Sequence, residues 1–193
     1  MPDARQLLSM AEAAPADSVE RHQLLVAAID AALEPIVVIV GGEAVNMITG
    51  TYQPTDIDLV GDVTQQDREV LVGLGFDWGG VGHRHISYSF PDGEIVLVEF
   101  PASELDGIRQ PIWHEIVPGI GVWVIALDDL MMDRLQQATD GTDVTMDAAV
   151  VLARAALDDV DWQAMEVEAD SPGNRQIGVP QALETVRSRA RQT

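Results

Sequence analysis

The chain has 193 residues, no cysteine and a formal net charge of −21 at pH 7, and its eleven basic residues are all arginine. This length is sufficient to bury one sizeable core, and the lack of cysteine excludes disulfides and thiolate metal sites, which fits a cytoplasmic protein. A surface this acidic disfavours broad binding to phosphate backbones, and no apolar run approaches the roughly 20 residues that span a bilayer. The acidic, amphipathic start of the chain also lacks the basic and apolar regions of an export signal.

The first elements in chain order are predicted to be two helices. Residues 4–13 and 18–33 both place apolar residues at helical spacing, and Pro15 separates them. Asp17 or Ser18 is the expected N-cap of the second helix, because either side chain can accept a hydrogen bond from the first turn.

A buried strand and a glycine pair follow these helices. Residues 36–40, Ile-Val-Val-Ile-Val, form a β-branched run of strand length. The run stops at Gly41 and Gly42, where the backbone can approach a ligand closely. Residues 43–48 then predict a helix whose first N–H groups would face a phosphate.

Two aspartates alternate with apolar residues on the next predicted strand, residues 56–60. Residues two apart on a strand project from the same face, so Asp56 and Asp58 would stand together while Ile57 and Leu59 enter the core. Two carboxylates this close repel each other unless a cation lies between them. Mg²⁺ prefers such oxygen ligands and is commonly held together with substrate phosphates, so the pattern predicts a site for metal ions and a nucleoside triphosphate.

A helix and a hairpin are predicted after these aspartates. Residues 64–74 have helical spacing, and residues 85–90 and 95–100 flank a Pro-Asp-Gly turn that is typical of a β-hairpin. The hairpin would place Glu99 on a strand that can lie beside the strand of the paired aspartates.

The last third of the chain changes from strands to helices. Residues 113–117 and 122–126 predict a second hairpin around a Pro-Gly turn. Helices are then expected at residues 128–138, 143–157, 161–167 and 181–191, with a glycine- and proline-containing loop at 169–180. The helical segments would form a small bundle.

The glycine pair and the alternating aspartates resemble the nucleotidyltransferase superfamily that includes DNA polymerase β. Its pattern is a strand, two small residues, a connecting segment and then Asp-apolar-Asp-apolar; here thirteen residues separate Gly42 from Asp56-Ile57-Asp58-Leu59. The stretches GGEAVNM and TDIDLV are most similar to nucleotidyltransferase-like toxins of the AbiEii and MenT types. The family also carries a third acid on a later strand, and Glu99 is the matching residue.

The resemblance implies an α/β (α+β) fold, in which a mixed β-sheet is flanked by helices and followed by a C-terminal helical bundle. Residues 1–127 would form the nucleotidyltransferase-like catalytic core, and residues 128–193 a helical region packed on it. The match extends over residues 36–157, which is well over half of the chain.

A second match and two departures concern the basic residues of the family. Residues 123–135 resemble the family's strand followed by a helix with a basic residue, here Arg134, and Asp143 and Asp147 match its Asp-x-x-x-Asp helix start. The family usually carries an arginine before the first aspartate, whereas the lead-in 51–55 has no positive charge, and lysine is common where Arg134 stands. Because arginine and lysine address phosphate with different geometry, these departures leave the identity of the nucleotide open.

The implied activity is transfer of a nucleoside monophosphate from a nucleoside triphosphate to an acceptor hydroxyl, dependent on Mg²⁺ or Mn²⁺. Asp56, Asp58 and Glu99 would hold two metal ions and carry out the catalysis, with Glu99 as the candidate acceptor of the proton. The residues implied to bind the triphosphate are Gly41, Gly42, Thr55 and Arg134. Candidates for further substrate contact are Arg84, Asp143 and Asp147.

The acceptor and the partners are left open by the sequence. By resemblance the acceptor is the 3′ end of a tRNA, which would make the chain a toxin restrained by a cognate antitoxin protein. A protein hydroxyl or a small molecule such as an aminoglycoside is an alternative acceptor. The acidic surface and the missing lead-in arginine favour a different class of protein, a non-catalytic module that binds a nucleotide or a partner. A third alternative is an antitoxin-like or structural role without metal dependence.

Two further groups of residues have functional and structural interpretations. His83 and His85 are two apart and could share a strand face; without a third soft ligand nearby, a structural or substrate-contact role is favoured over metal ligation. Arg187, Arg189 and Arg191 form a basic cluster, which is more often a tail that neutralises acidic neighbours than a contact for RNA. For Arg134, the structural alternative is a surface ion pair with Asp133 or Asp129.

Overall fold

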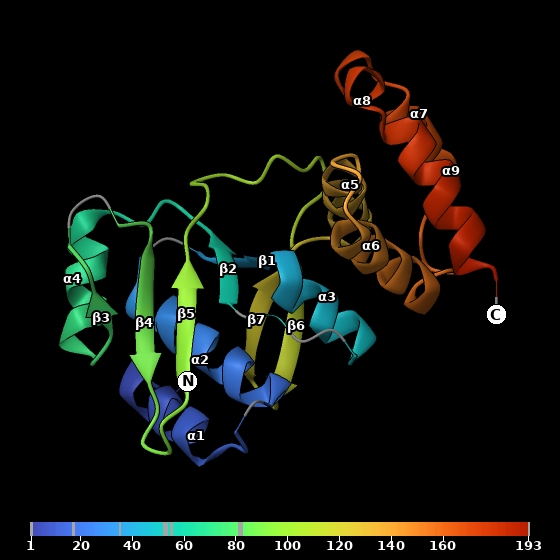
Figure 1. Ribbon diagram of the computed structural model, residues 1–193. Coiled ribbons are helices and arrows are strands. Elements are labelled where there is room, and N and C mark those ends of the chain that lie inside the picture. The colour runs from blue at the N-terminus through green and yellow to red at the C-terminus, as the bar shows by residue number, and fades with distance from the viewer. Residues whose placement is uncertain are drawn as a thin grey trace. The chain divides into compact units, whose positions relative to one another are not determined.

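The computed structural model describes residues 2–16, 18–34, 36–51, 54, 56–80 and 83–192. The chain divides into two compact units: Met1–Ala44 with Gln53–Ile125, and Val45–Tyr52 with Ala126–Thr193. The first unit contains a β-sheet and its covering helices, and the second is built from helices (Figure 1). None of the described helices is long and apolar enough to cross a membrane.

The chain begins with the two predicted helices, α1 (Ala4–Ala13) and α2 (Val19–Ala32). Asp3 caps α1 in a capping box, and the Ser18 hydroxyl accepts a hydrogen bond from the first turn of α2. The apolar residues of α2 that are fully buried include Leu24, Leu25, Ala28 and Ile29. This helix packs against α1 and against the sheet, and every residue from 23 to 29 is buried.

Seven strands of the described residues form one mixed sheet, in the order β3-β4-β5-β2-β1-β7-β6. Their bounds are β1 Val38–Val40, β2 Asp56–Val60, β3 Asp77–Trp78, β4 His85–Ser89, β5 Ile95–Glu99, β6 Ile112–Val117 and β7 Ile120–Val124. The pairs β2–β5 and β1–β7 are parallel, and the other neighbouring pairs are antiparallel. The predicted mixed sheet flanked by helices is therefore confirmed.

The two faces of the sheet differ because side chains alternate along each strand. On β2, β4 and β5 the buried side chains are Ile57, Leu59, Ile86, Tyr88, Val96 and Val98. Figure 1 shows α1 and α2 behind β4 and β5, on the side that these apolar residues face. On the other face, the side chains of β4 and β5 are exposed or half-buried, and Asp56 and Asp58 of β2 are half-buried.

The connections of the first unit follow the predicted hairpins, with one strand that the pattern missed. β4 pairs with β5 in continuous register from His85–Glu99 to Ser89–Ile95. Helix α4 (Gln65–Gly73) has Thr64 as its N-cap in a capping box. The short strand β3 then adds to the free edge of β4, and two residues are too few to give a period in sequence.

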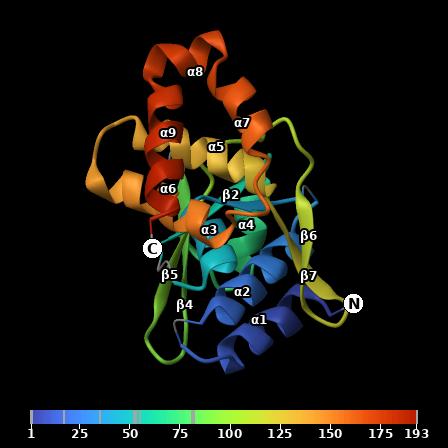
Figure 2. The same cartoon turned by 90° about the vertical axis from the view of Figure 1, so that its right-hand side faces the viewer.

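The second unit contains five helices after the sheet, α5 Leu127–Ala138, α6 Asp143–Ala155, α7 Trp162–Ala169, α8 Pro172–Ile177 and α9 Val179–Ala190. Figure 2 shows α5, α6 and α9 next to one another, in agreement with their contacts. Fully buried apolar side chains of this unit include Leu130, Met131, Leu135, Leu152 and Val186.

The loop predicted at 169–180 is wrong, because α8 lies within it and α9 begins before its end. Pro172 and Pro180 each occupy the first turn of a helix, where the missing N–H of proline is tolerated. Gly178 lies between the two helices with φ of 93°, a conformation that favours glycine. The same residues that indicated a loop therefore begin and end helices.

Candidate metal centre

The sheet topology brings the three predicted acids together. Strand β2 lies between β1 and β5, and Asp58 is in register with Val40 on one side and with Glu99 on the other. Asp56 lies one pleat earlier on the same face of β2, opposite Leu97. Parallel pairing of β2 and β5 is what places Glu99 beside the aspartates, since both strands end at the same edge.

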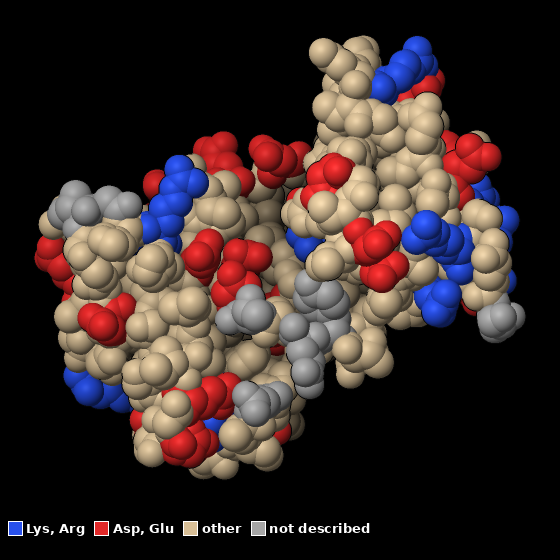
Figure 3. All heavy atoms as spheres, viewed as in Figure 1, with Lys and Arg blue, Asp and Glu red and all other residues tan. Residues whose placement is uncertain are grey.

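One carboxylate oxygen from each of Asp56, Asp58 and Glu99 lies within 4.8 Å of the other two. All three residues are half-buried, and Figure 3 shows acidic side chains gathered at the ends of β2 and β5. Like charges at this separation raise the energy of the fully ionised site. Three converging carboxylates are a suitable donor set for a hard divalent cation.

Gly41 is fitted to this site by its missing side chain. Its φ is +63°, and an added Cβ would lie 2.1 Å from Oδ2 of Asp58. Any larger residue at this position would therefore have to displace the carboxylate. Helix α3 (Gly41–Thr49) begins at this glycine, directly after β1. The prediction that the helix starts at Glu43 is therefore wrong by two residues, and Gly42 belongs to its first turn.

Of the other predicted residues in the first unit, Arg84 is exposed directly before β4, and its carbonyl accepts a hydrogen bond from the Phe100 N–H at 3.1 Å. Thr55 lies outside the described residues.

Arg134, Asp143 and Asp147 belong to the second unit and are described there. Arg134 on α5 is buried and forms an ion pair of 2.6 Å with Asp133. The predicted ion pair with Asp133 is therefore present, but Arg134 is not on the surface. Asp143 is the first residue of α6. The exposed carboxylate of Asp147 lies 3.9 Å from Arg189.

A buried polar network that sequence reasoning missed lies behind the first turn of α3. The Glu43 side chain is 0% exposed. Its Oε2 is 3.2 Å from Nδ1 of His22, and Nε2 of His22 is 3.4 Å from Oε1 of Glu94. Oε1 of Glu43 has no hydrogen-bond partner. One signal in the sequence was the single charge of Glu43 in a helix start that otherwise reads Gly-Gly-Ala-Val.

The charges of this network set the state of His22. Burial alone would lower the pKa of His22, but its hydrogen bonds to Glu43 and Glu94 outweigh burial and raise the pKa above the ordinary value of 6.5. Next to it, Arg21 is buried and forms ion pairs with Asp92 at 2.7 Å and Glu94 at 2.5 Å. The network therefore ties α2 to the β4–β5 hairpin and to the start of α3.

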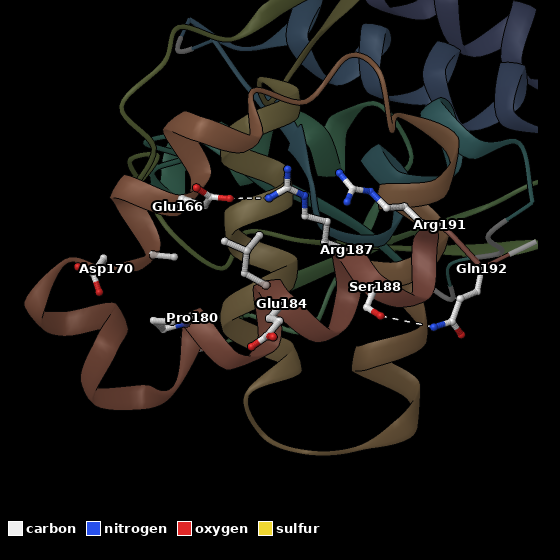
Figure 4. Close-up of a pocket in the computed structure, with 10 residues that line it drawn as sticks. Glu166, Asp170, Pro180, Glu184, Arg187, Ser188, Arg191 and Gln192 are labelled. Atoms are coloured by element: carbon white, nitrogen blue, oxygen red, sulfur yellow. Dashed lines mark hydrogen bonds and ion pairs between the residues drawn. The ribbon is translucent and has the colours of Figure 1, made fainter.

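A separate hollow of about 620 Å³ lies between α7 and α9 in the second unit (Figure 4). Its wall includes the apolar side chain of Leu183, and Arg187 forms an ion pair with Glu166 at 2.5 Å. The lining also includes the polar side chains of Asp170, Glu184, Ser188, Arg191 and Gln192. Among the described residues, no trio of metal-ligating side chains occurs there. We therefore place the candidate chemistry at the carboxylates of β2 and β5.

Comparisons with known proteins support the fold. The chain matches no protein-family model and no curated protein. Its structure is similar to the crystal structure of an antigenic nucleotidyltransferase-like protein from Paracoccidioides brasiliensis, with a TM-score of 0.58 and 15% sequence identity. The similarity covers 88% of this chain and 94% of that one. At this identity the likeness shows a nucleotidyltransferase-like fold.

Proposed function

We propose that this chain is a Mg²⁺-dependent nucleotidyltransferase, which transfers a nucleoside monophosphate from a nucleoside triphosphate to an acceptor hydroxyl. The observation that carries the proposal is the convergence of carboxylate oxygens of Asp56, Asp58 and Glu99 within 4.8 Å of one another. The close approach of Gly41 to Asp58 and the nucleotidyltransferase-like fold support it.

The three carboxylates fit a Mg²⁺ or Mn²⁺ ion by their chemistry, because all offer hard oxygen ligands. Gly41 leaves the Asp58 oxygen in place, where a Cβ would displace it. A bound divalent ion would supply neutralisation of phosphate charge and would lower the pKa of an attacking hydroxyl. Asp56, Asp58 and Glu99 would hold it.

The start of α3 is the proposed binding site of the triphosphate. Helix α3 follows β1 with no intervening loop, so its first turn lies at the end of that strand. The N–H groups of a first turn, here including those of Gly41 and Gly42, have no partner within the helix and lie at the positive end of its dipole. Thr55 and Arg134 are proposed as further triphosphate contacts on the resemblance of their positions.

The reaction would be an in-line displacement at the α-phosphate. The acceptor oxygen forms a bond to the α-phosphorus, the bond to the pyrophosphate oxygen breaks, and pyrophosphate leaves. The proton of the hydroxyl passes to the Glu99 carboxylate, which lies beside Asp58. The products are a nucleotidylated acceptor and pyrophosphate.

We propose the 3′ end of a tRNA as the acceptor, which makes the chain a cytoplasmic toxin with a cognate antitoxin. In this proposal residues 1–127 are the catalytic core, residues 128–193 support it, and Arg84, Asp143 and Asp147 are available for the acceptor. The second candidate is a non-catalytic nucleotide- or partner-binding module. It is favoured by the net charge of −21 and by the absence of a basic residue from positions 51–55.

Incubation with total tRNA, Mg²⁺ and each α-labelled nucleoside triphosphate tests the proposal. We expect label on tRNA with the wild type and none with Asp56→Ala. Label on protein would mean that the acceptor is a protein and not tRNA. Transfer to neither, with intact triphosphate binding, would support the binding module. A partner that binds wild type and Asp56→Asn equally, without any transfer, would contradict the enzyme.

A further inference from the structure

Two histidines lie beside the acidic residues on the β4 side of the sheet. His85 is in register with Glu99 across the antiparallel pair β4–β5. The Phe100 N–H donates to the Arg84 carbonyl, so residues 84 and 100 form a hydrogen-bonded pair, and the next pair, His85 and Glu99, is of the non-hydrogen-bonded kind. In such pairs the two side chains stand closest to each other. His85 therefore projects next to the candidate metal centre.

His83 is held in place beside His85. The two imidazole rings are 5.6 Å apart between centroids and meet edge to face. The His83 carbonyl accepts hydrogen bonds from the Arg68 guanidinium and, at 3.4 Å, from the Trp78 indole. The His83 ring lies so close to Gly79 that an added Cβ would be 3.0 Å from it. The loop before β4 thus fixes a second aromatic ring near the site.

The histidines are exposed and adjoin exposed apolar side chains. His83 and His85 are both exposed, and on β5 Leu97 is 40% and Ile95 63% exposed on the face that carries Glu99. The metal-ligating trio of described residues contains only the carboxylates, so His85 lies next to the donor set and not within it. Exposed flat rings beside apolar residues are suited to stacking a planar ligand.

Given the proposed function, the strand order indicates that this surface meets the acceptor and not the nucleoside triphosphate. The triphosphate would lie at the start of α3, which follows β1, on one side of β2; β5 and β4 lie on the other side. In an in-line displacement the leaving pyrophosphate and the attacking hydroxyl are on opposite sides of the α-phosphorus. The acceptor must therefore approach over β5 and β4, where His85 and His83 are located.

We propose that His83 and His85 form the acceptor-binding surface for the terminal nucleobase of a nucleic-acid acceptor. Because the two rings are perpendicular, one ring stacks on the face of the base and the other contacts its edge. Histidine rings are among those on which unpaired bases stack, and stacking needs no net positive charge. The surface would explain how a chain of charge −21 can hold the end of an RNA without a basic groove.

The four histidines of the chain, at positions 22, 83, 85 and 114, permit a direct binding test. The protons on the Cε1 atoms of the four imidazoles give four NMR signals, which single substitutions assign. The probe is the ribotrinucleotide CCA in the presence of Mg²⁺ without nucleoside triphosphate, and ribose 5-phosphate is the matched probe without a base. We expect CCA to move the signals of His83 and His85 alone, and ribose 5-phosphate to move neither. No movement, equal movement of all four signals, or an equal effect of ribose 5-phosphate would overturn the proposal.

Kinetics with total tRNA provide the second readout. Removing one stacked base contact costs roughly 5- to 100-fold in affinity, so His83→Ala and His85→Ala should raise KM for tRNA by such a factor and leave KM for the nucleoside triphosphate unchanged. His85→Phe should restore the KM, since it keeps a flat ring. His114→Ala is the control, because His114 is an exposed strand histidine on β6 at the opposite end of the sheet.

The two readouts separate this proposal from the proposed function. If the wild type transfers label to no acceptor, the function fails, while the NMR titration still decides whether a base binds at the histidines. If transfer to tRNA occurs but neither alanine variant differs from His114→Ala, the function holds and the histidine surface is refuted. Transfer to a protein acceptor alone would refute the nucleobase surface.

Discussion

Gly41 combines two restrictions that can be separated experimentally. Its φ is +63°, and an added Cβ would lie 2.1 Å from the Asp58 carboxylate. Gly50 has nearly the same φ, +62°, but no atom lies within 4 Å of an added Cβ. Gly50→Ala should therefore cost only the backbone strain, about 1–2 kcal/mol. Gly41→Ala should cost more, because it must also displace the carboxylate.

Urea unfolding of the two alanine variants measures this difference. We expect the free energy of unfolding to fall further for Gly41→Ala than for Gly50→Ala, and metal-induced stabilisation to weaken only in Gly41→Ala. Equal losses in the two variants would mean that the contact between residue 41 and Asp58 is unimportant for the site.

Replacement of a single carboxylate tests the metal centre without any knowledge of the acceptor. A ligand that binds only the folded state stabilises it, by about 2.7 kcal/mol at a concentration of 100 times Kd. MgCl₂ or MnCl₂ should therefore raise the Tm of the wild type, and Asp58→Asn should lose most of this increase.

The control for this experiment must separate binding from screening, because the chain carries a charge of −21. KCl at matched ionic strength gives the screening contribution. Asp77→Asn is the matched variant, since Asp77 is an exposed acid on β3, and it should keep the full response to metal. A response to metal that survives in Asp58→Asn would place the ion elsewhere.

At the scale of elements, the network of His22, Glu43 and Glu94 links α2, the start of α3 and the β4–β5 hairpin. The pKa of His22 is raised in the folded protein, so the folded state binds the proton more tightly than the unfolded state does. The resulting stability is fully present below the unfolded value of 6.5 and is lost as the pH rises through the folded pKa.

His22→Gln should therefore change how stability depends on pH. We expect the wild type to lose free energy of unfolding relative to His22→Gln as the pH rises from about 6 to about 8, the range in which histidine titrates. Urea unfolding at several pH values gives this difference. His114→Gln, which replaces an exposed histidine of β6, should follow the wild type. A constant difference between wild type and His22→Gln would show that the linkage is absent.

Elements with a strong local pattern could be predicted from the sequence. The alternation on β2 and the turn between β4 and β5 are local signals; they predict Asp56 and Asp58 on one face of a strand and Glu99 on a hairpin strand. The role of Glu99 was predicted from the resemblance, as the match to the family's third acid, and the parallel pairing that places it beside Asp58 is a finding of the structure. Helices α1 and α2 were likewise predicted from their periodicity, and the Ser18 cap of α2 was among the predicted candidates.

Features that depend on contacts between distant segments could not be predicted in this way. His22 meets Glu43 and Glu94, which are 21 and 72 residues away along the chain, and no local period records such contacts. The same applies to β3, which exists only as a partner of β4. At α8, proline and glycine predict a loop from the sequence, although in the structure they begin and end a helix, because the same residue types serve both roles.

At the scale of the whole molecule, the large negative charge is only partly balanced by arginine. Several arginines are engaged by acidic neighbours: Arg21 by Asp92 and Glu94, Arg134 by Asp133, and Arg187 by Glu166. These pairs reduce the positive charge that is available for a polyanion. The interpretation of Arg187 as a residue that neutralises an acidic neighbour agrees with its ion pair.

The charge predicts an unusual salt dependence of transfer to tRNA. Proteins that bind nucleic acid through basic surfaces lose about 10³-fold or more in affinity between about 50 and 200 mM salt, because counterions are no longer released favourably. Here the long-range interaction between the chain and RNA is repulsive, and salt screens it. We expect kcat/KM for tRNA to stay level or rise over this range at constant free Mg²⁺.

The trinucleotide CCA is the control for this measurement, because it has few phosphates and should respond little to salt. A level or rising profile for tRNA, with a flat one for CCA, would agree with recognition of the RNA end by stacking at His83 and His85. A steep fall for tRNA would contradict it and would indicate that a basic surface carries the RNA. The arginines at positions 187, 189 and 191 on and next to α9 would then be the residues to replace, since they form the basic cluster of the chain.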